Sequence, residues 1–250
     1  FLGALTVVAV YGMGRKISSD FWGVFAAAFL AVRFLHVRDS HYGTPDITMA
    51  FFVTLCVTLC ASALTAKDAK KHLFLAGVAG SFAVATKWIA LPVLIPLLWA
   101  TLTTSGLRKM QPALKKKHKT ILPAFFGLGI GALLGAFQII VNPKPYWSKV
   151  SAEYLTARSE GFLGVWQVDI LPGWVFYLKT LIYGLGIVLL ALALFGSVRR
   201  TVLAIRNRSK ADVMLLSFPL IYFGVMGSTR HYFARYTLPL VPFAALFAAE

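Results

Sequence analysis

Long apolar runs, separated by short polar or basic linkers, constrain the fold of this chain more than any other feature. A helix needs about 20 predominantly apolar residues to cross a membrane, and runs approaching this length recur along the whole sequence. The chain is 58% hydrophobic and 14% charged, whereas an ordinary soluble domain is about 25% charged. We therefore expect an all-α fold, a polytopic integral membrane helical bundle that forms one domain over residues 1–250.

The apolar runs predict about nine spans in this chain. They cover residues 2–13, 21–35, 47–64, 73–103, 121–141, 174–198, 213–225 and 238–249. The run 73–103 is too long for one span and contains Lys87, Pro92 and Pro96. We expect it to cross twice, as a hairpin that turns near Lys87, because a single crossing would put neighbouring basic linkers on opposite sides. The sequence starts at Phe1 inside one apolar run and stops directly after another, so we interpret it as a fragment of a longer protein.

The positive charge of the chain follows this topology. The formal net charge is +16, and 16 of the 25 lysines and arginines fall in four linkers that share one side of the membrane. The side richer in Lys and Arg is cytoplasmic, so the remaining polar stretches face outward. We interpret the charge as a topology signal and expect no nucleic-acid partner. The predicted location is the plasma (inner) membrane, with several passes and an outward-facing active site.

The densest polar cluster is RDSHYGTPD, residues 38–46, between two apolar runs. Ionisable groups are costly near lipid and tend to mark function. A histidine within a few residues of two carboxylates suits acid–base chemistry or a divalent metal, so Asp39, His41 and Asp46 are the candidate catalytic residues. Asp46 follows Pro45 at the start of an apolar run, and we also expect it to cap the next helix.

Cations form the other outward clusters. The predicted substrate-binding residues are Arg38, Lys87, Arg230, His231 and Arg235. Lys87 is the strongest candidate, because an ionisable side chain inside a long apolar run is tolerated at a turn that lines a wet cavity. The alternatives are a lysine that snorkels to the surface and, for TRHYFARY at 229–236, an interfacial belt of aromatics and arginines. Cations at the lipid–water boundary suit an anionic head group on a lipid tail.

A polar stretch at about 143–172 mixes aromatic and charged residues at helical spacing. This pattern predicts an outward helical segment that lies on the membrane surface. Trp147 suits that depth, since tryptophan is enriched at membrane interfaces.

Three glycines, Gly127, Gly131 and Gly135, form two overlapping G-x-x-x-G patterns. Such a pattern predicts that a neighbouring helix approaches closely. A dinucleotide-binding loop is excluded, because no strand or βαβ context surrounds these glycines.

Four segments, taken in order, resemble GT-C glycosyltransferases that use polyprenyl-phosphate sugars. They are FLGALTVVAVYGMGRKI, PDITMAFFVTL, GSFAVATKWIALPVLIPLL and RHYFARYTLPLVPFAAL. This group includes the dolichyl-phosphate-mannose protein mannosyltransferases and the bacterial lipid A aminoarabinose and lipopolysaccharide-core transferases. The resemblance covers nearly the whole chain and implies a GT-C-like membrane fold.

The resemblance implies that the protein is a membrane glycosyltransferase that moves a sugar from a polyprenyl-phosphate donor to an acceptor hydroxyl on a lipid, glycan or protein. It implies that Lys87 and the cations of 229–236 face the donor phosphate, and that Asp46 belongs to the second outer loop of the catalytic face. It also implies that the main catalytic carboxylate lies upstream of Phe1. A divalent metal near Asp39, His41 and Asp46 is the one cofactor that the sequence allows, without requiring it.

A polytopic transporter or flippase for an anionic lipid or solute is the alternative function. It would use the same cations to line a pathway. Transporters often contain paired broken helices in two halves, and only the run 73–103 looks broken in this sequence. A structural membrane subunit is a third hypothesis.

Overall fold

Every regular element is a helix in the computed structural model, which describes residues 1–105, 114–159, 173–229 and 232–250. The α-helices are α1 (Leu2–Ile17), α2 (Asp20–Ala31), α3 (Phe34–His41), α4 (Pro45–Thr65), α5 (Lys70–Thr86), α6 (Leu94–Thr104), α7 (Leu114–Gly135), α8 (Phe137–Val141), α9 (Pro143–Ser159), α10 (Gly173–Leu185), α11 (Ile187–Arg206), α12 (Lys210–Gly227) and α13 (Val241–Ala249). Two 3-10 helices, η1 (Trp88–Val93) and η2 (Ala234–Leu240), contain Pro92 and Pro239 and lead directly into α6 and α13. The predicted all-α fold class is confirmed.

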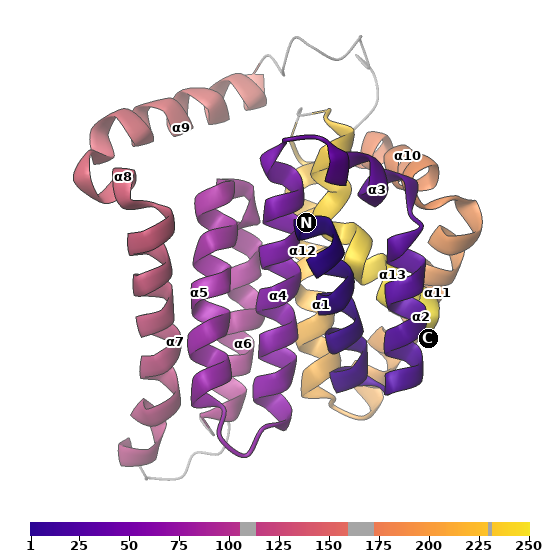
Figure 1. Cartoon of the computed structure of the whole chain (residues 1–250), viewed down its shortest axis with the longest axis horizontal. Helices are drawn as coiled ribbons and strands as arrows, with labels where there is room; N and C mark the ends of the chain where they lie inside the picture. Colours follow the sequence, from indigo (N-terminus) through magenta and orange to yellow (C-terminus); the bar gives the residue numbers. More distant parts are fainter. Residues whose placement is uncertain (106–113, 160–172, 230–231) are drawn as a thin grey trace.

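Most of the α-helices stand side by side in one bundle (Figure 1). Among the described residues, α4, α11 and α12 are long and apolar enough to span a membrane, and α2 with α3 makes a fourth span if this bent pair counts as one. Shorter apolar helices, such as α6 and α13, pack among them. Each predicted apolar run is helical over most of its length, which agrees with the predicted multi-span bundle.

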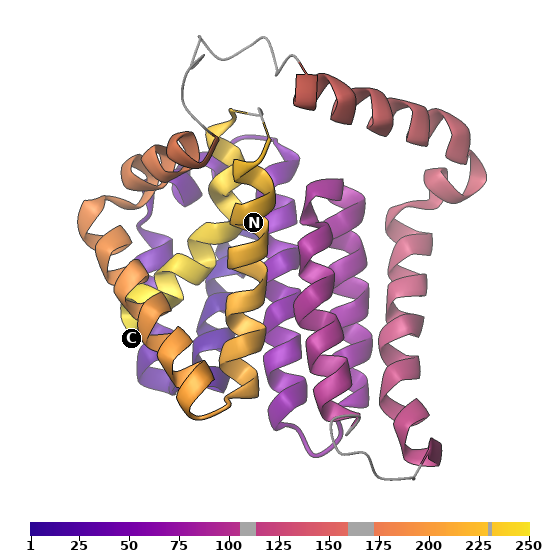
Figure 2. The ribbon, with the colours of Figure 1, turned by 180° about the vertical axis from the view of Figure 1, so that it is seen from behind.

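The run 73–103 forms the predicted hairpin. Figures 1 and 2 show α5 running to one end of the bundle and α6 returning toward the other. Lys87 lies at the turn, between the last residue of α5 and the first residue of η1. The expectation that the run turns near Lys87 is therefore confirmed.

The elements that carry the predicted functional clusters meet at one end of the bundle. α3, the turn after α5, α9 and η2 all lie at the end drawn uppermost in Figure 1. α9 lies across this end in both views, and residues 160–172 of the segment predicted at about 143–172 lie outside the described residues. The α1–α2, α4–α5 and α11–α12 connections lie at the opposite end. We call the end that carries α3, the turn after α5, α9 and η2 the site end.

The first of two departures from the predicted elements concerns RDSHYGTPD, which is helical as far as His41. α2 and α3 are bent by 60° at the break between them. Arg33 satisfies backbone carbonyls beside this break, because its Nε donates to Phe29 O at 3.0 Å and its Nη1 to Leu185 O at 2.9 Å. This polar cluster is therefore the end of a short helix, followed by an extended segment that leads into α4.

The second departure is a break within the predicted run 174–198. Gly186 separates α10 from α11 and has a φ of +80°, a conformation that favours glycine. Of these two helices, only α11 is long enough to span a membrane by itself. The predicted apolar span at 174–198 is therefore interrupted at Gly186.

Glycines let α5 and α7 pack closely, as the G-x-x-x-G patterns predict. A Cβ atom at Gly127 would lie 2.0 Å from Phe74 O, and one at Gly131 would lie 2.6 Å from the Ser81 Cβ. The Ser81 hydroxyl also donates a hydrogen bond to Leu128 O at 2.7 Å. This close approach holds α7, and therefore α8 and α9, beside the site end.

Candidate active site

Asp46 is the centre of a charged cluster at the site end. Pro45 occupies the first position of α4, and the Asp46 side chain that follows it is 0% exposed. Lys87 Nζ donates a hydrogen bond to Asp46 Oδ1 at 2.7 Å, while Arg235 Nε lies 3.4 Å from Asp46 Oδ2. One buried carboxylate of α4 thus faces two cations that come from the α5–η1 turn and from η2.

Asp46 does not cap α4, so the N-cap prediction is wrong. The N-cap position belongs to Thr44, whose side chain makes no capping hydrogen bond. The reason is that Pro45 takes the first helical position, which proline favours, and this moves Asp46 into the first turn. A carboxylate there still suits the positive end of the helix dipole, and its oxygens are directed to Lys87 and Arg235.

Lys87 is held in place and does not snorkel freely into solvent. Its side chain is 19% exposed, and Nζ lies 4.4 Å from the centroid of the Tyr236 ring, a distance typical of a cation–π contact. Burial lowers the pKa of the Lys87 ammonium, and the hydrogen bond and charge of Asp46 offset part of this decrease. The carboxylate therefore supports the charge on Lys87.

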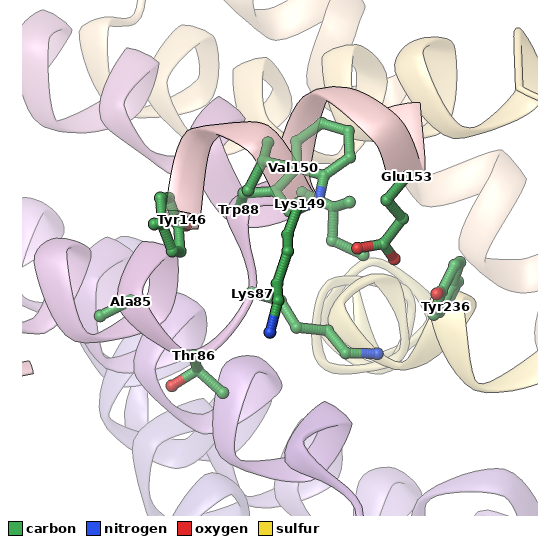
Figure 3. A pocket seen from close by; sticks show the side chains of 10 residues that line it. Ala85, Thr86, Lys87, Trp88, Tyr146, Lys149, Val150, Glu153 and Tyr236 are labelled. Carbon is green, nitrogen blue, oxygen red and sulfur yellow. The ribbon is translucent and has the colours of Figure 1, made fainter. Parts of the chain in front are cut away.

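A cavity of about 330 Å³ lies between Lys87 and α9 (Figure 3), and we call it the Lys87 cavity. From α9 it is lined by Tyr146, Lys149, Val150 and Glu153. Figure 3 shows Lys149 extending from α9 toward Lys87, and Glu153 toward Tyr236. These four α9 residues were not among the predicted site residues, although their i, i+3, i+4, i+7 spacing places them on one helix face.

A second cavity of about 420 Å³ is lined by Arg235 and not by Lys87. We call it the Arg38–Arg235 cavity, and its walls include Arg38, Asp39, Tyr42, Thr44, Phe233 and Arg235. Arg38 Nη2 donates a hydrogen bond to Asp39 Oδ2 at 2.7 Å, and the Asp39 side chain is 5% exposed. The structure therefore brings Arg38, Asp39 and Arg235 together, in a space separate from the one beside Lys87.

The remaining predicted site residues are placed less centrally. His41 is exposed at the end of α3, where its Nδ1 lies 2.7 Å from Val37 O, and it lines neither of these cavities. Within the described ranges, no group of three His, Cys, Asp or Glu side chains could hold a metal ion. Asp39, His41 and Asp46 therefore do not form the metal site that the sequence allows. Arg230 and His231 lie outside the described residues.

Comparison with known families gives one match that contains the centre of this cluster. A family model described as dolichyl-phosphate-mannose-protein mannosyltransferase matches residues 1–135, a range that includes Asp46 and Lys87. An uncharacterized protein of Aquifex aeolicus (strain VF5) is 34% identical over 88 residues, which cover 34% of this chain and 17% of that protein.

Crystal structures of the Archaeoglobus fulgidus oligosaccharyltransferase have a similar fold. The apo form has a TM-score of 0.55 at 16% identity and covers 99% of this chain and 38% of that chain. The complex with Zn and sulfate has a TM-score of 0.56 at 17% identity, covering 99% and 36%. The form tethered with an acceptor peptide containing the NVT sequon has a TM-score of 0.58 at 16% identity, again covering 99% and 36%. The chain thus spans less than two fifths of that enzyme, and the likeness confirms the GT-C-like fold.

Proposed function

The chain belongs to the dolichyl-phosphate-mannose-protein mannosyltransferase family, and on this basis we propose that it forms the membrane core of a glycosyltransferase. The enzyme would transfer a sugar from a polyprenyl-phosphate donor to an acceptor hydroxyl on a lipid, glycan or protein, at the outer face of the plasma membrane. The observation that carries the proposal is the buried Asp46–Lys87 ion pair, which holds a cation beside a cavity at one end of the bundle.

A cation in this position suits the chemistry of a lipid phosphate. The isoprenoid tail would lie against apolar helices, and the phosphate would lie at the membrane surface, at the level of Lys87. Lys149 reaches into the same cavity from α9, so two ammonium groups are available to one phosphate. Charge-assisted hydrogen bonds of this kind are shorter and stronger than neutral ones.

In the proposed reaction a base takes the proton of the acceptor hydroxyl, and the hydroxyl oxygen attacks the anomeric carbon of the donor sugar. The bond between that carbon and the phosphate oxygen breaks, and the polyprenyl phosphate leaves with the electron pair. Lys87 would stabilise the negative charge that grows on the leaving phosphate, which is where a fixed cation contributes most to catalysis.

Asp46 would act by positioning Lys87. This carboxylate is 0% exposed and lines neither cavity, so its route to an acceptor is blocked by its own partners. Asp39, which lines the Arg38–Arg235 cavity, and the exposed His41 remain the candidates within the chain for a catalytic role. The main base that the sequence analysis places upstream of Phe1 stays a prediction.

A transfer assay tests this function. Full-length protein, purified in detergent, should convert a polyprenyl-phosphate sugar and an acceptor into product. A transporter would form no product, because transport requires two compartments and makes no glycosidic bond. Lys87→Ala should lower turnover at least about tenfold, because a hydrogen bond to a charged group contributes about 1.5–3 kcal/mol. Lys149→Ala should have a smaller effect, since Lys149 is exposed. Lys144→Ala is the matched control, because Lys144 is also exposed on α9 but does not line the cavity.

Two results would count against the proposal. Unchanged turnover and donor affinity in Lys87→Ala would show that Lys87 does not bind the donor phosphate. An absence of transfer with every lipid-phosphate sugar, together with movement of an anionic lipid across vesicle bilayers, would establish the transporter alternative.

A further inference from the structure

The predicted substrate-binding cations that the structure describes are divided between two cavities. Lys87 lines the cavity under α9, whereas Arg38 and Arg235 line the other, and the two cavities share no lining residue. Asp46 lies between the two sets, with Oδ1 bonded to Lys87 and Oδ2 facing Arg235. A single phosphate group in either cavity would therefore contact only one of the two sets.

The Arg38–Arg235 cavity has hydrogen-bonding atoms that lack partners. Thr44 Oγ1 is buried and has no hydrogen-bond partner among the described residues, whereas Arg235 Nε makes no hydrogen bond but faces Asp46 Oδ2 at 3.4 Å. Arg38 uses Nε and Nη2 for Asp39, which leaves Nη1 available. Buried polar atoms in proteins are nearly always hydrogen-bonded, so the unpaired Thr44 hydroxyl indicates a ligand. Two guanidinium groups and a hydroxyl match the several acceptor oxygens of a phosphate.

The charge of the cluster also favours an anion. Four cations, Arg38, Lys87, Lys149 and Arg235, lie near three carboxylates, Asp39, Asp46 and Glu153. The side chains of Arg38 and Arg235 are 34% and 39% exposed, so a ligand can reach them. The one positive charge that these three carboxylates leave uncompensated is therefore accessible from the site end.

We propose that the Arg38–Arg235 cavity binds a second phosphate group, which belongs to the acceptor. The proposal rests on the proposed function, which assigns the donor phosphate to the Lys87 cavity. It narrows the acceptor to a class of molecule that carries a phosphate, either on a lipid or on a glycan. Tyr42 and Phe233 in the cavity wall supply aromatic surface that would pack against the part of the acceptor next to its phosphate.

The test counts phosphate sites on the full-length protein in a phosphate-free detergent, with farnesyl phosphate as the probe in isothermal titration calorimetry. Wild-type protein should bind two equivalents. Arg38→Gln/Arg235→Gln should remove the site in the Arg38–Arg235 cavity, and Lys87→Ala should remove the site in the Lys87 cavity. Thr44→Val should weaken phosphate binding in the Arg38–Arg235 cavity about threefold to tenfold. Arg15→Gln, at an exposed ion pair in the last turn of α1, should keep both sites. An unchanged size-exclusion profile shows that the double variant is folded, and Thr44→Val tests the same cavity with a milder change.

Competition in Lys87→Ala identifies the source of the phosphate. Displacement of farnesyl phosphate by dioctanoyl phosphatidic acid alone would support a phosphorylated lipid, and displacement also by inorganic phosphate would support a phosphate borne by a soluble glycan. One equivalent bound by the wild type, or two equivalents in both Arg38→Gln/Arg235→Gln and Thr44→Val, would overturn the proposal. These outcomes would not affect the proposed role of Lys87. Unchanged turnover in Lys87→Ala would instead contradict the proposed function, and phosphate binding in the Arg38–Arg235 cavity could still be measured.

Discussion

The substitution Asp46→Asn removes one negative charge from the centre of the site and preserves the shape of the side chain. Lys87 and Arg235 would then share a buried neighbour that no longer balances their charge. We expect the protein to fold with lower stability, and Lys87 to lose its fixed position over the Tyr236 ring.

The magnitude follows from burial. Removing one partner of a buried ion pair costs about 3–5 kcal/mol. Asp46 is 0% exposed but Lys87 is 19% exposed, so the loss should fall at the lower end of that range. Arg235 adds little, because its side chain is 39% exposed and its Nε lies 3.4 Å from the carboxylate. A loss of about 3 kcal/mol corresponds to a decrease in Tm of about 6–12 °C for a chain of this size.

Thermal unfolding in detergent measures this loss, and Asp20→Asn is the matched control. Asp20 lies 3.0 Å from Arg15, but the two side chains are 68% and 56% exposed, so the control should lose less than about 1 kcal/mol. The double variant Asp46→Asn/Lys87→Met should lose less than the sum of its single variants by about 1–3 kcal/mol. Equal decreases in Tm for the two Asn variants, or strictly additive losses in the double variant, would refute the reasoning.

Two further predictions concern topology and packing. In intact cells an impermeant thiol reagent should label Ser151→Cys on α9 and not Asn207→Cys after α11; the reverse pattern would invert the assigned topology. Gly127→Val should destabilise the α5–α7 contact by several kcal/mol, because a Cβ there would lie 2.0 Å from a backbone oxygen of α5 and overpacking costs about 1–3 kcal/mol or more. Gly129→Ala, which has open space around its Cβ, should keep or raise Tm; equal losses in the two variants would contradict the packing.

The large elements of this fold could be predicted because lipid imposes a simple rule on the sequence. The basic linkers on both sides of the run 73–103 required two crossings, and a lysine inside an apolar run is costly unless the chain turns there, so the turn was expected near Lys87. The positive-inside pattern then grouped the connections that the structure places at the opposite end of the bundle from the functional clusters. The break at Gly186 escaped prediction, because an isolated glycine within an apolar run does not by itself specify a positive φ.

The contacts of the site were harder to predict because they join residues far apart in sequence. Local rules made Asp46 an N-cap, yet its partner Lys87 is 41 residues away. Lys149 and Glu153 were missed because their place in the site depends on where α9 lies over the bundle, which no local pattern encodes. The division of the cations between two cavities likewise depends on the relative placement of α3, α5, α9 and η2.

The two cations nearest Asp46 stand on similar pieces of backbone. Lys87 directly precedes η1 and Arg235 is the second residue of η2, and each is followed within a few residues by a proline of its 3-10 helix. Proline fixes φ, and the ring contacts of Lys87 with Tyr236 and of Arg235 with Phe233 restrict both side chains further. Both charges are therefore ordered when the chain folds, before a ligand binds. The entropy of immobilising long side chains, which usually weakens binding by cationic surfaces, is largely absent from the binding step at this site.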